Sequence, residues 1–265
     1  MMRVLIVEQD KLVAVSSAMV RVLEEVRHVA TQRVSVLLTG ESGCGKEVLA
    51  TVLHGMSDRR EGPLVRVRCG AAGDCAEWLT EADGGTLFLD DVGALSLAGQ
   101  LELLRVLESA EIRLVAATNE NLVGSFNTDL YQRIAGRRIA IPPLRDRPED
   151  LAELARRFAA PCVIATAAMA MLLRHRWPGN VRELRTVIAQ ARLAADGDEI
   201  GAQALEPLLP AASEDLELRQ RVKGFERELF AEALRRTDGK KAAAARLLGI
   251  DPSNWAYHAK RLNLQ

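Results

Sequence analysis

The chain has 265 residues, of which 48% are hydrophobic and 4% aromatic, and its formal net charge is −1. That hydrophobic share is enough for a packed core and argues against disorder, while the length allows one medium-sized domain and a small one. Neither the apolar start of the chain nor any later apolar run is long enough for a secretory signal or a bilayer-spanning helix, so we expect a cytoplasmic protein with no membrane partner.

The first part of the chain alternates short apolar strands with helices. Strands are expected over residues 34–38, 64–67, 86–89 and 112–116, and helices over 17–29, 47–54 and 97–108, with a short strand or helix start at 4–7. This alternation predicts an α/β fold with a mostly parallel sheet that is covered by helices on both faces.

After residue 143 the sequence predicts helices only. Segments 148–158, 166–176 and 180–194 have helical spacing, and residues 196–213, with two prolines and two glycines, suggest a linker. A long helix over 214–236 and two short ones around Gly249 follow. We therefore expect an α/β subdomain at 1–143, a helical lid at 144–195, a linker at 196–213 and a small all-α domain at 214–265.

The strongest chemical signal is Gly40-Glu-Ser-Gly-Cys-Gly-Lys-Glu47, between an expected strand and an expected helix. Glycines at 40, 43 and 45 let backbone N–H groups converge on phosphate oxygens, and the helix directs its positive end to the same place. Lys46 would meet the β and γ phosphates as a point charge. The alternative is a chance glycine-rich turn, because Glu47 stands where Ser or Thr is usual.

The strand Thr86-Leu-Phe-Leu-Asp-Asp91 ends in two carboxylates. Asp90 would hold Mg²⁺ through its water shell, and Asp91 stands where a base that activates water is needed. The alternative is a strand followed by an ordinary pair of loop carboxylates. The preceding phosphate loop favours the magnesium site.

These motifs resemble those of bacterial enhancer-binding proteins, the AAA+ family that activates sigma-54 RNA polymerase. The phosphate loop matches, Glu47 included, and so does Asp83–Asp90 as the Walker B strand. Further matches are the first sensor Ala116–Asn119, the signature Pro142–Arg147 and the second sensor Trp177–Leu184. The resemblance runs from about Ser16 to the C-terminus.

The resemblance implies an AAA+ P-loop core with a helical lid, and ATP and Mg²⁺ as cofactors. Asp90 would serve the metal, Asp91 catalysis, and Arg133 would be an arginine finger that enters a neighbouring subunit's site in a ring, unless it is an ordinary surface arginine. The nucleotide-binding residues would be Gly40, Ser42, Gly43, Cys44, Gly45, Lys46, Glu47, Thr118, Asn119 and Arg182.

The sequence also departs from the family pattern. The GAFTGA loop that grips sigma-54 should lie between the strands ending near Cys69 and starting at Thr86, and residues 70–85 are too few for it. The second pore loop is missing as well, because Glu108 leads almost directly to Ile112. We therefore expect that the protein does not engage sigma-54.

Three active-site positions differ too. Asp91 replaces a glutamate, Arg68 an asparagine that orients this glutamate, and Asn127 an arginine. Together they predict a core that binds nucleotide and hydrolyses it slowly or not at all.

The C-terminal segment is basic, with 11 Lys and Arg against 5 Asp and Glu from Arg219 onward. It resembles a Fis-type helix-turn-helix, in which Ala245 and Gly249 would let two helices cross closely and Trp255, Ala259 and Leu262 would face the core. The expected DNA-binding residues are Lys240, Lys241, Ser253, Asn254, Tyr257, His258, Lys260 and Arg261. The spacing of Leu218, Val222, Phe225 and Leu229 suits a two-helix dimer seam, and hence a palindromic double-stranded DNA site. A dimerisation hairpin with a solvated basic face is the alternative.

The cysteines (Cys44, Cys69, Cys75 and Cys162) form no CxxC pair and predict reduced thiols without metal. Met2–Asp10 faintly resembles the start of a receiver domain, for which the segment before residue 40 is too short. Three functions stay open: a DNA-binding regulator that does not remodel sigma-54 polymerase, a working sigma-54 activator ATPase with short loops, and an accessory subunit that joins or blocks a full-length relative.

Overall fold

The computed structural model describes residues 12–70, 75–107, 112–122, 124, 126–195, 197–209, 226, 229–230, 232–237, 239–251 and 255. The chain divides into two compact units, Met1–Leu209 and Pro210–Gln265, and each is considered by itself. The expected segment at residues 4–7 lies outside the described residues. Within the described residues, no helix combines the length and the apolar content needed to cross a membrane.

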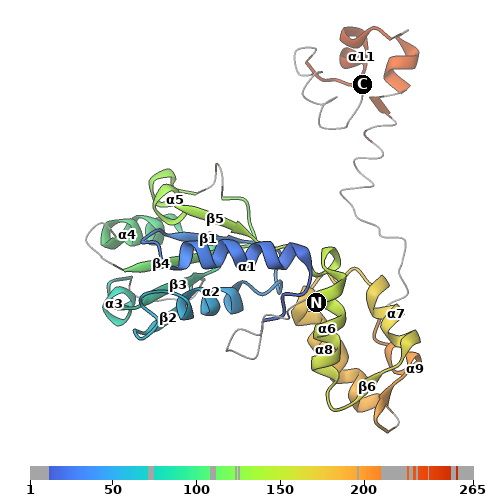
Figure 1. The fold of residues 1–265 in the computed structure, drawn as a ribbon. Coiled ribbons are helices and arrows are strands. Elements are labelled where there is room, and N and C mark those ends of the chain that lie inside the picture. The colour runs from blue at the N-terminus through green and yellow to red at the C-terminus, as the bar shows by residue number, and fades with distance from the viewer. Residues whose placement is uncertain are drawn as a thin grey trace. The chain divides into compact units, whose positions relative to one another are not determined.

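The first unit is built on a five-stranded sheet with the order β2-β3-β4-β1-β5 (Figure 1). The strands are β1 (Val36–Thr39), β2 (Leu64–Arg68), β3 (Thr86–Asp90), β4 (Arg113–Thr118) and β5 (Arg137–Ala140). All the pairings are parallel, which confirms the predicted sheet. Strand β5 was not predicted, because only Ile139 of this edge strand is buried and its arginines interrupt the apolar pattern.

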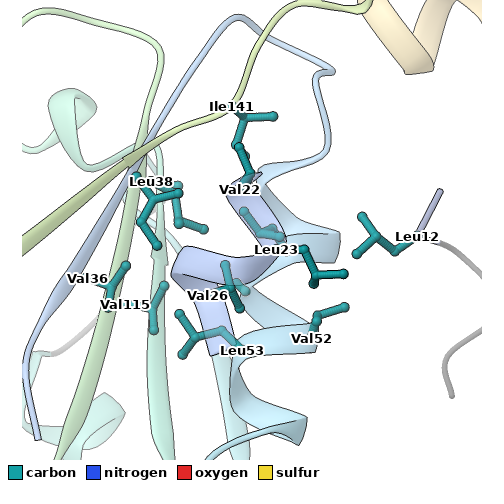
Figure 2. Packing of buried hydrophobic residues seen from close by; sticks show 14 of the residues in the cluster. Leu12, Val22, Leu23, Val26, Val36, Leu38, Val52, Leu53, Val115 and Ile141 are labelled. Carbon is teal, nitrogen blue, oxygen red and sulfur yellow. The ribbon is translucent and has the colours of Figure 1, made fainter. Parts of the chain in front are cut away.

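Helices cover both faces of this sheet, as predicted. Helices α1 (Ser17–Ala30) and α2 (Lys46–Gly55) pack on one face, where Val22, Leu23 and Leu53 meet Val36 and Leu38 of the sheet (Figure 2). The other face is covered by α3 (Cys75–Glu81), α4 (Leu97–Leu107) and α5 (Thr128–Ile134), with the 3-10 turn η1 (Val92–Ala94). Burial on both faces explains why the central strands are continuous apolar runs.

A helical lid follows the sheet within the same unit. It comprises the 3-10 turn η2 (Leu144–Asp146), α6 (Pro148–Ala159), α7 (Thr166–Arg174), α8 (Asn180–Ala194) and α9 (Ala202–Leu205), with a two-stranded parallel sheet of β6 (Val163–Ile164) and β7 (Glu199–Ile200). Trp177 and Leu184 lie at its core.

Two predictions for this region were wrong. The lid is not purely helical, since β6 pairs with β7. Residues 197–209, expected to be linker, include β7 and α9 and pack into the lid through Ile200, Leu205 and Leu209. Pro207 and the two glycines suggested a linker, but these three apolar residues are buried against α6, α7 and α8, and burial decides the structure. The boundaries at residues 143 and 213 stay predictions.

The second unit is helical where it is described. Residues 226, 229–230 and 232–236 are helical, α11 spans Lys241–Leu247, and a small core joins Phe230, Ala233, Ala244, Ala245 and Trp255. The rings of Phe230 and Trp255 have centroids 4.9 Å apart. Trp255 is buried as the sequence predicted, whereas Ala259 and Leu262 lie outside the described residues.

Gly249 is explained by its backbone conformation. A Cβ atom added to it would meet no described atom within 4 Å, and residues 252–254 and 256–265, where the second expected helix lies, are outside the described residues, so the close crossing at Ala245 and Gly249 stays a prediction. Gly249 has φ +70° after α11, where the N–H of Ile250 donates to Ala245 O and that of Gly249 to Arg246 O. This is a Schellman C-cap, which needs a residue in the left-handed region.

Candidate functional site

The predicted phosphate loop lies at the carboxyl end of β1, beside the end of β4. Thr39 and Thr118 are register partners, and the Gly40 N–H donates to Thr118 O at 3.3 Å. Gly45 caps the N-terminus of α2 with φ 110°, a left-handed conformation that favours glycine. Carboxyl ends of parallel strands are where α/β sheets bind ligands.

Backbone donors and Lys46 converge on this loop. Among the described residues, the N–H groups of Gly43, Gly45 and Lys46 have no acceptor within the protein. Lys46 Nζ donates to the carbonyl oxygens of Gly40 (2.8 Å) and Glu41 (3.1 Å). The loop therefore presents free N–H groups and a lysine whose bonds to carbonyls can be exchanged for bonds to an anion.

Residues of the lid form hydrogen bonds with the phosphate loop. Val181 N–H donates to Gly43 O (3.0 Å), and Arg182 Nη1 donates to Ser42 Oγ (3.0 Å). A Cβ atom on Gly43 would lie 2.3 Å from Gly179 O, so only glycine lets the two segments approach this closely. The expected nucleotide residues Ser42, Gly43 and Arg182 are thus brought together.

Asn180 is the central contact between the lid and the loop. Its side chain is buried and accepts from Leu144 N–H at 2.7 Å, while its Nδ2 donates to Glu41 Oε2 and Ser42 O, both at 3.1 Å. Its φ of 52° is a left-handed conformation that asparagine tolerates better than most residues. Arg145 donates to both carboxylate oxygens of Glu41, at 2.9 and 2.6 Å.

Arg147 and Asp150 form a buried junction behind the loop. Arg147 Nη2 donates to Cys44 O at 2.7 Å, and the guanidinium lies 3.9 Å from the Asp150 carboxylate. Asp150 also accepts from the N–H groups of Val15 and Ser16 and from Ser16 Oγ, which caps α1. Burial lowers the pKa of Arg147, and the charge of Asp150 acts against this shift. The junction therefore ties the loop to both α1 and α6.

The expected catalytic carboxylates lie at the same edge of the sheet. Asp90 ends β3, and Asp91 follows in a left-handed conformation with φ 58°. Arg68, on the neighbouring strand β2, is the register partner of Asp90. Burial, with the charges of Asp90 and Asp91, raises the pKa of the nearby Cys69 thiol to about 12, so this thiol stays protonated.

The two sensor residues occupy different environments. Thr118 is buried at the end of β4, and its hydroxyl accepts from Glu120 N–H at 3.0 Å. Asn119 is exposed just beyond the strand. Cys44 has a buried side chain, and burial raises its pKa, so it serves the loop through its backbone. The cysteines are free, as predicted.

The side chains of two expected site residues find their partners outside the phosphate loop. Arg133 lies near the end of α5, where its Nη2 donates to Leu107 O at 2.8 Å, toward the amino ends of β4 and β5. Glu47 is exposed on α2 and forms an ion pair with Arg66 at 3.2 Å. Arg133 therefore contacts the end of α4, and Glu47 contacts β2.

The expected DNA-binding residues are only partly described. Lys240 and Lys241 are exposed at the start of α11. Ser253, Asn254, Tyr257, His258, Lys260 and Arg261 lie outside the described residues, as do Leu218, Val222 and Phe225 of the expected seam, of which only Leu229 is described.

Sequence reasoning missed the side chains that join the lid to the loop. Glu41, Arg145, Arg147 and Asn180 all lie within motifs quoted above, yet none had an assigned role. Their presence in long matching motifs was the available signal. The contacts that join the lid to the phosphate loop span more than 100 positions along the chain, so these pairings were not readable.

Family models match almost the whole described chain. A sigma-54 interaction domain matches residues 13–144, an AAA+ ATPase lid domain residues 145–221, and a bacterial regulatory protein domain of the Fis family residues 222–257. The chain belongs to the sigma-54 interaction domain family. This confirms the predicted resemblance and the AAA+ core with lid and Fis-type domain.

Curated relatives agree with this membership. The Nif-specific regulatory protein of Azotobacter vinelandii is 33% identical over an alignment that covers 97% of this chain and 59% of the relative. Nitric oxide reductase transcription regulator NorR2 of Cupriavidus necator is 36% identical, with 95% and 63% covered. The chain thus spans about three fifths of the length of these relatives.

Solved structures of similar proteins have the same fold as this chain. Crystal structures of NtrX from Brucella abortus in complex with ADP and with ATP both superpose with a TM-score of 0.70 at 28% identity, covering 96% of this chain and 69% and 70% of NtrX. A RuvB variant of Thermotoga maritima shares the fold alone, with a TM-score of 0.56 at 18% identity.

Proposed function

We propose that this chain is a DNA-binding transcriptional regulator whose AAA+ core binds ATP with Mg²⁺, hydrolyses it slowly or not at all, and does not remodel sigma-54 polymerase. The observation that carries the proposal is the phosphate loop, which keeps unpaired N–H groups and a lysine while residues of the lid bind the carbonyl oxygens of Ser42 and Gly43. Membership of a family of sigma-54-dependent regulators supports the regulatory role.

ATP binding is supported by the fit of the loop to a phosphate chain. The unpaired N–H groups of Gly43, Gly45 and Lys46 would bind phosphate oxygens, Arg182 would add a lid cation, and Asp90 would hold the magnesium ion through water. The related NtrX was solved with ATP and with ADP.

Slow hydrolysis is supported by three positions, 68, 91 and 127, at which this chain differs from the family pattern. Arg68 places a cation in register with Asp90, where the family pattern has a neutral asparagine. Asp91 is one methylene shorter than the family's glutamate, so its carboxylate reaches less far toward a water. Asn127 caps α5 by accepting from Leu130 N–H at 2.9 Å, a structural role that the family's arginine would not fill.

Lack of sigma-54 engagement is supported by the short connections. Residues 69–85 join β2 to β3, and α3 occupies seven of them. Residues 108–112 join α4 to β4. The alignment with the Nif-specific regulatory protein extends over 311 positions, more than the 265 residues of this chain, so that relative has internal residues that this chain lacks.

DNA binding is supported by the Fis-type domain and by exposed Lys240 and Lys241. We propose that two chains pair through their C-terminal helices on a palindromic site. The AAA+ cores would form a ring in which Arg133 acts on a neighbouring subunit's nucleotide, since its own chain's phosphate loop does not receive it.

Two alternatives remain for experiment. A working sigma-54 activator ATPase is favoured by the family membership itself, and an accessory subunit by the complete AAA+ core without room for the sigma-54 loops. A pull-down with sigma-54 and an ATP transition-state mimic tests the first: a stable complex would restore the activator role. Mixing the chain with a full-length relative from its host tests the second, through a change in that relative's activity.

Calorimetric titration with ATP and Mg²⁺ tests the core of the proposal. We expect saturable binding by the wild-type chain and none by Lys46→Ala, because the main phosphate charge is lost. Arg60→Gln should bind as the wild type does, because the Arg60 side chain is exposed and pairs with Glu61. Equal affinity of wild type and Lys46→Ala would overturn the assignment of the nucleotide site.

A further inference from the structure

A pocket of about 430 Å³ lies at the edge of the sheet opposite the phosphate loop, at the amino ends of β1, β4 and β5. Its described lining includes four arginines, Arg33, Arg59, Arg113 and Arg133, and one carboxylate, that of Asp58. We propose that this pocket is a second anion site, for a small phosphate-bearing ligand.

Three of the four guanidinium groups are oriented by backbone carbonyls and not by carboxylates. Arg113 donates to Val29 O and Gln32 O, both at 2.7 Å, Arg133 to Leu107 O at 2.8 Å, and Arg59 to Gly85 O at 3.4 Å. These acceptors are all backbone carbonyls. Within the described ranges, none of the four arginines forms an ion pair. Among the described lining residues, four arginines thus stand against one carboxylate, so the described part of the pocket carries an excess of positive charge.

Arg113 is the buried member of the group. Its side chain lies inside the protein, and its Nε has no hydrogen-bond partner. Burial lowers its pKa, the charge of Arg59 acts in the same direction, and that of Asp58 acts against them. A buried cation with incomplete compensation is destabilising, and an anion in the pocket would relieve it.

A purely structural role explains only part of this arrangement. Arg113 bonds carbonyls at the end of α1, where a cation is favourable because of the helix dipole. That role does not account for Arg33, Arg59 and Arg133, which come from three other segments and line the same pocket. Arg33 and Arg133 are exposed and free to reach a ligand.

Phosphate is the anion that fits this chemistry. Guanidinium groups bind phosphate oxygens in bidentate fashion, and several arginines around one pocket are typical of phosphate recognition. The volume lies within the roughly 300–1,000 Å³ of small-molecule sites, and Leu107, Ile112 and Leu114 give the pocket an apolar wall for the rest of the ligand.

The position of the pocket has a regulatory consequence, which rests on the proposed function. Arg133 lines it, so a bound anion would hold the guanidinium that the family resemblance assigns to a neighbouring subunit's nucleotide. The phosphate loop lies at the other edge of the sheet, so both sites can be filled at once. The ligand would then oppose hydrolysis in the ring without displacing ATP.

The test is calorimetric titration of the full chain with inorganic pyrophosphate, in a Lys46→Ala background that removes the phosphate-loop site. We expect this variant to bind pyrophosphate, and the added changes Arg33→Gln and Arg59→Gln to weaken binding at least about tenfold. Arg60→Gln is the matched control, since Arg60 neighbours Arg59 in sequence but is exposed, pairs with Glu61 and does not line the pocket. It should change nothing.

Each outcome separates this site from the nucleotide site. Pyrophosphate binding that is lost with Lys46→Ala alone would place the anion in the phosphate loop and overturn the pocket, while leaving ATP binding intact as a proposal. Undiminished binding by the Arg33→Gln, Arg59→Gln variant would also overturn it. If the wild-type chain did not bind ATP, the proposed function would be wrong, but the test of the pocket with pyrophosphate would still be valid.

Discussion

Glu41 of the phosphate loop and Arg145 of the lid form a bidentate ion pair, with N–O distances of 2.9 and 2.6 Å. The hydrogen bond from Arg145 lowers the pKa of Glu41, burial acts against it, and Asn180 adds a second lowering bond. The loop that would surround the phosphates is thereby fixed to the domain that would close over the nucleotide.

Reversing one charge of this pair is expected to weaken nucleotide binding. Glu41→Arg or Arg145→Glu should lower ATP affinity about tenfold, or about 1.4 kcal/mol, because like charges would push the loop from the lid. The double variant, with the charges exchanged, should recover part of the loss. Calorimetry measures all three affinities.

The ion pair between Arg157 and Glu153 supplies the control for this test. It lies within α6, has an N–O distance of 3.0 Å, is similarly half-buried and does not touch the loop. Arg157→Gln should leave ATP affinity unchanged. Single reversals at Glu41 and Arg145 that bind ATP normally would show that the pair does not position the loop.

Removing the Asp150 carboxylate is expected to destabilise the first unit. Asp150→Ala leaves Arg147 buried without its anion and three donors near residues 15 and 16 without an acceptor. We expect a loss of about 3–5 kcal/mol in the free energy of unfolding. Denaturant unfolding measures it, with Asp198→Ala as comparison because the Asp198 side chain is exposed; equal midpoints would contradict the structural role.

Restoring the family residues beside the Walker B strand is expected to raise ATP turnover. Asp91→Glu extends the carboxylate by one methylene, and Arg68→Asn removes the cation in register with Asp90. A steady-state phosphate-release assay, at concentrations where rings form, compares the double variant with the wild type. Rapid turnover by the unaltered chain would contradict the proposed slow hydrolysis.

Removing Lys240 and Lys241 is expected to weaken DNA binding for all sequences alike. Each lost phosphate contact should reduce the slope of log affinity against log salt by about 0.9. Arg236→Ala is a suitable control, because Arg236 is exposed in the same unit but is paired with Glu232 at 2.8 Å. The slope is measured by titrating operator DNA at several salt concentrations. An unchanged slope for the lysine variants would show that Lys240 and Lys241 do not contact the phosphates.

Replacing Gly249 is expected to loosen the second unit through backbone strain alone. Gly249→Ala forces a Cβ into φ +70° and should cost about 1 kcal/mol, although this Cβ meets no atom of the described residues. Gly249→Asn should cost less, because asparagine tolerates this conformation. Thermal unfolding of the chain, followed at the Trp255 core, measures both; equal costs for alanine and asparagine would mean that φ is not the cause.

The sequence by itself determined the elements whose signals are local. The phosphate loop, the strand ending in Asp90, and helices such as Asn180–Ala194 were readable because their residues are adjacent or repeat at helical spacing. The family and its three segments followed from contiguous motifs. The C-terminal unit was recognised in the same way, from a small-residue helix, a glycine and a basic charge pattern.

Only the tertiary structure decided what these elements do to one another. Asn180 meets Glu41 across 139 positions of sequence, and Arg145 meets it across 104, so no local pattern announces either contact. Ile200 and Leu205 became part of the lid because burial outweighed the glycines and proline around them. Arg133 and Arg113 share a pocket because parallel strands align their amino ends, a property of the sheet and not of either segment.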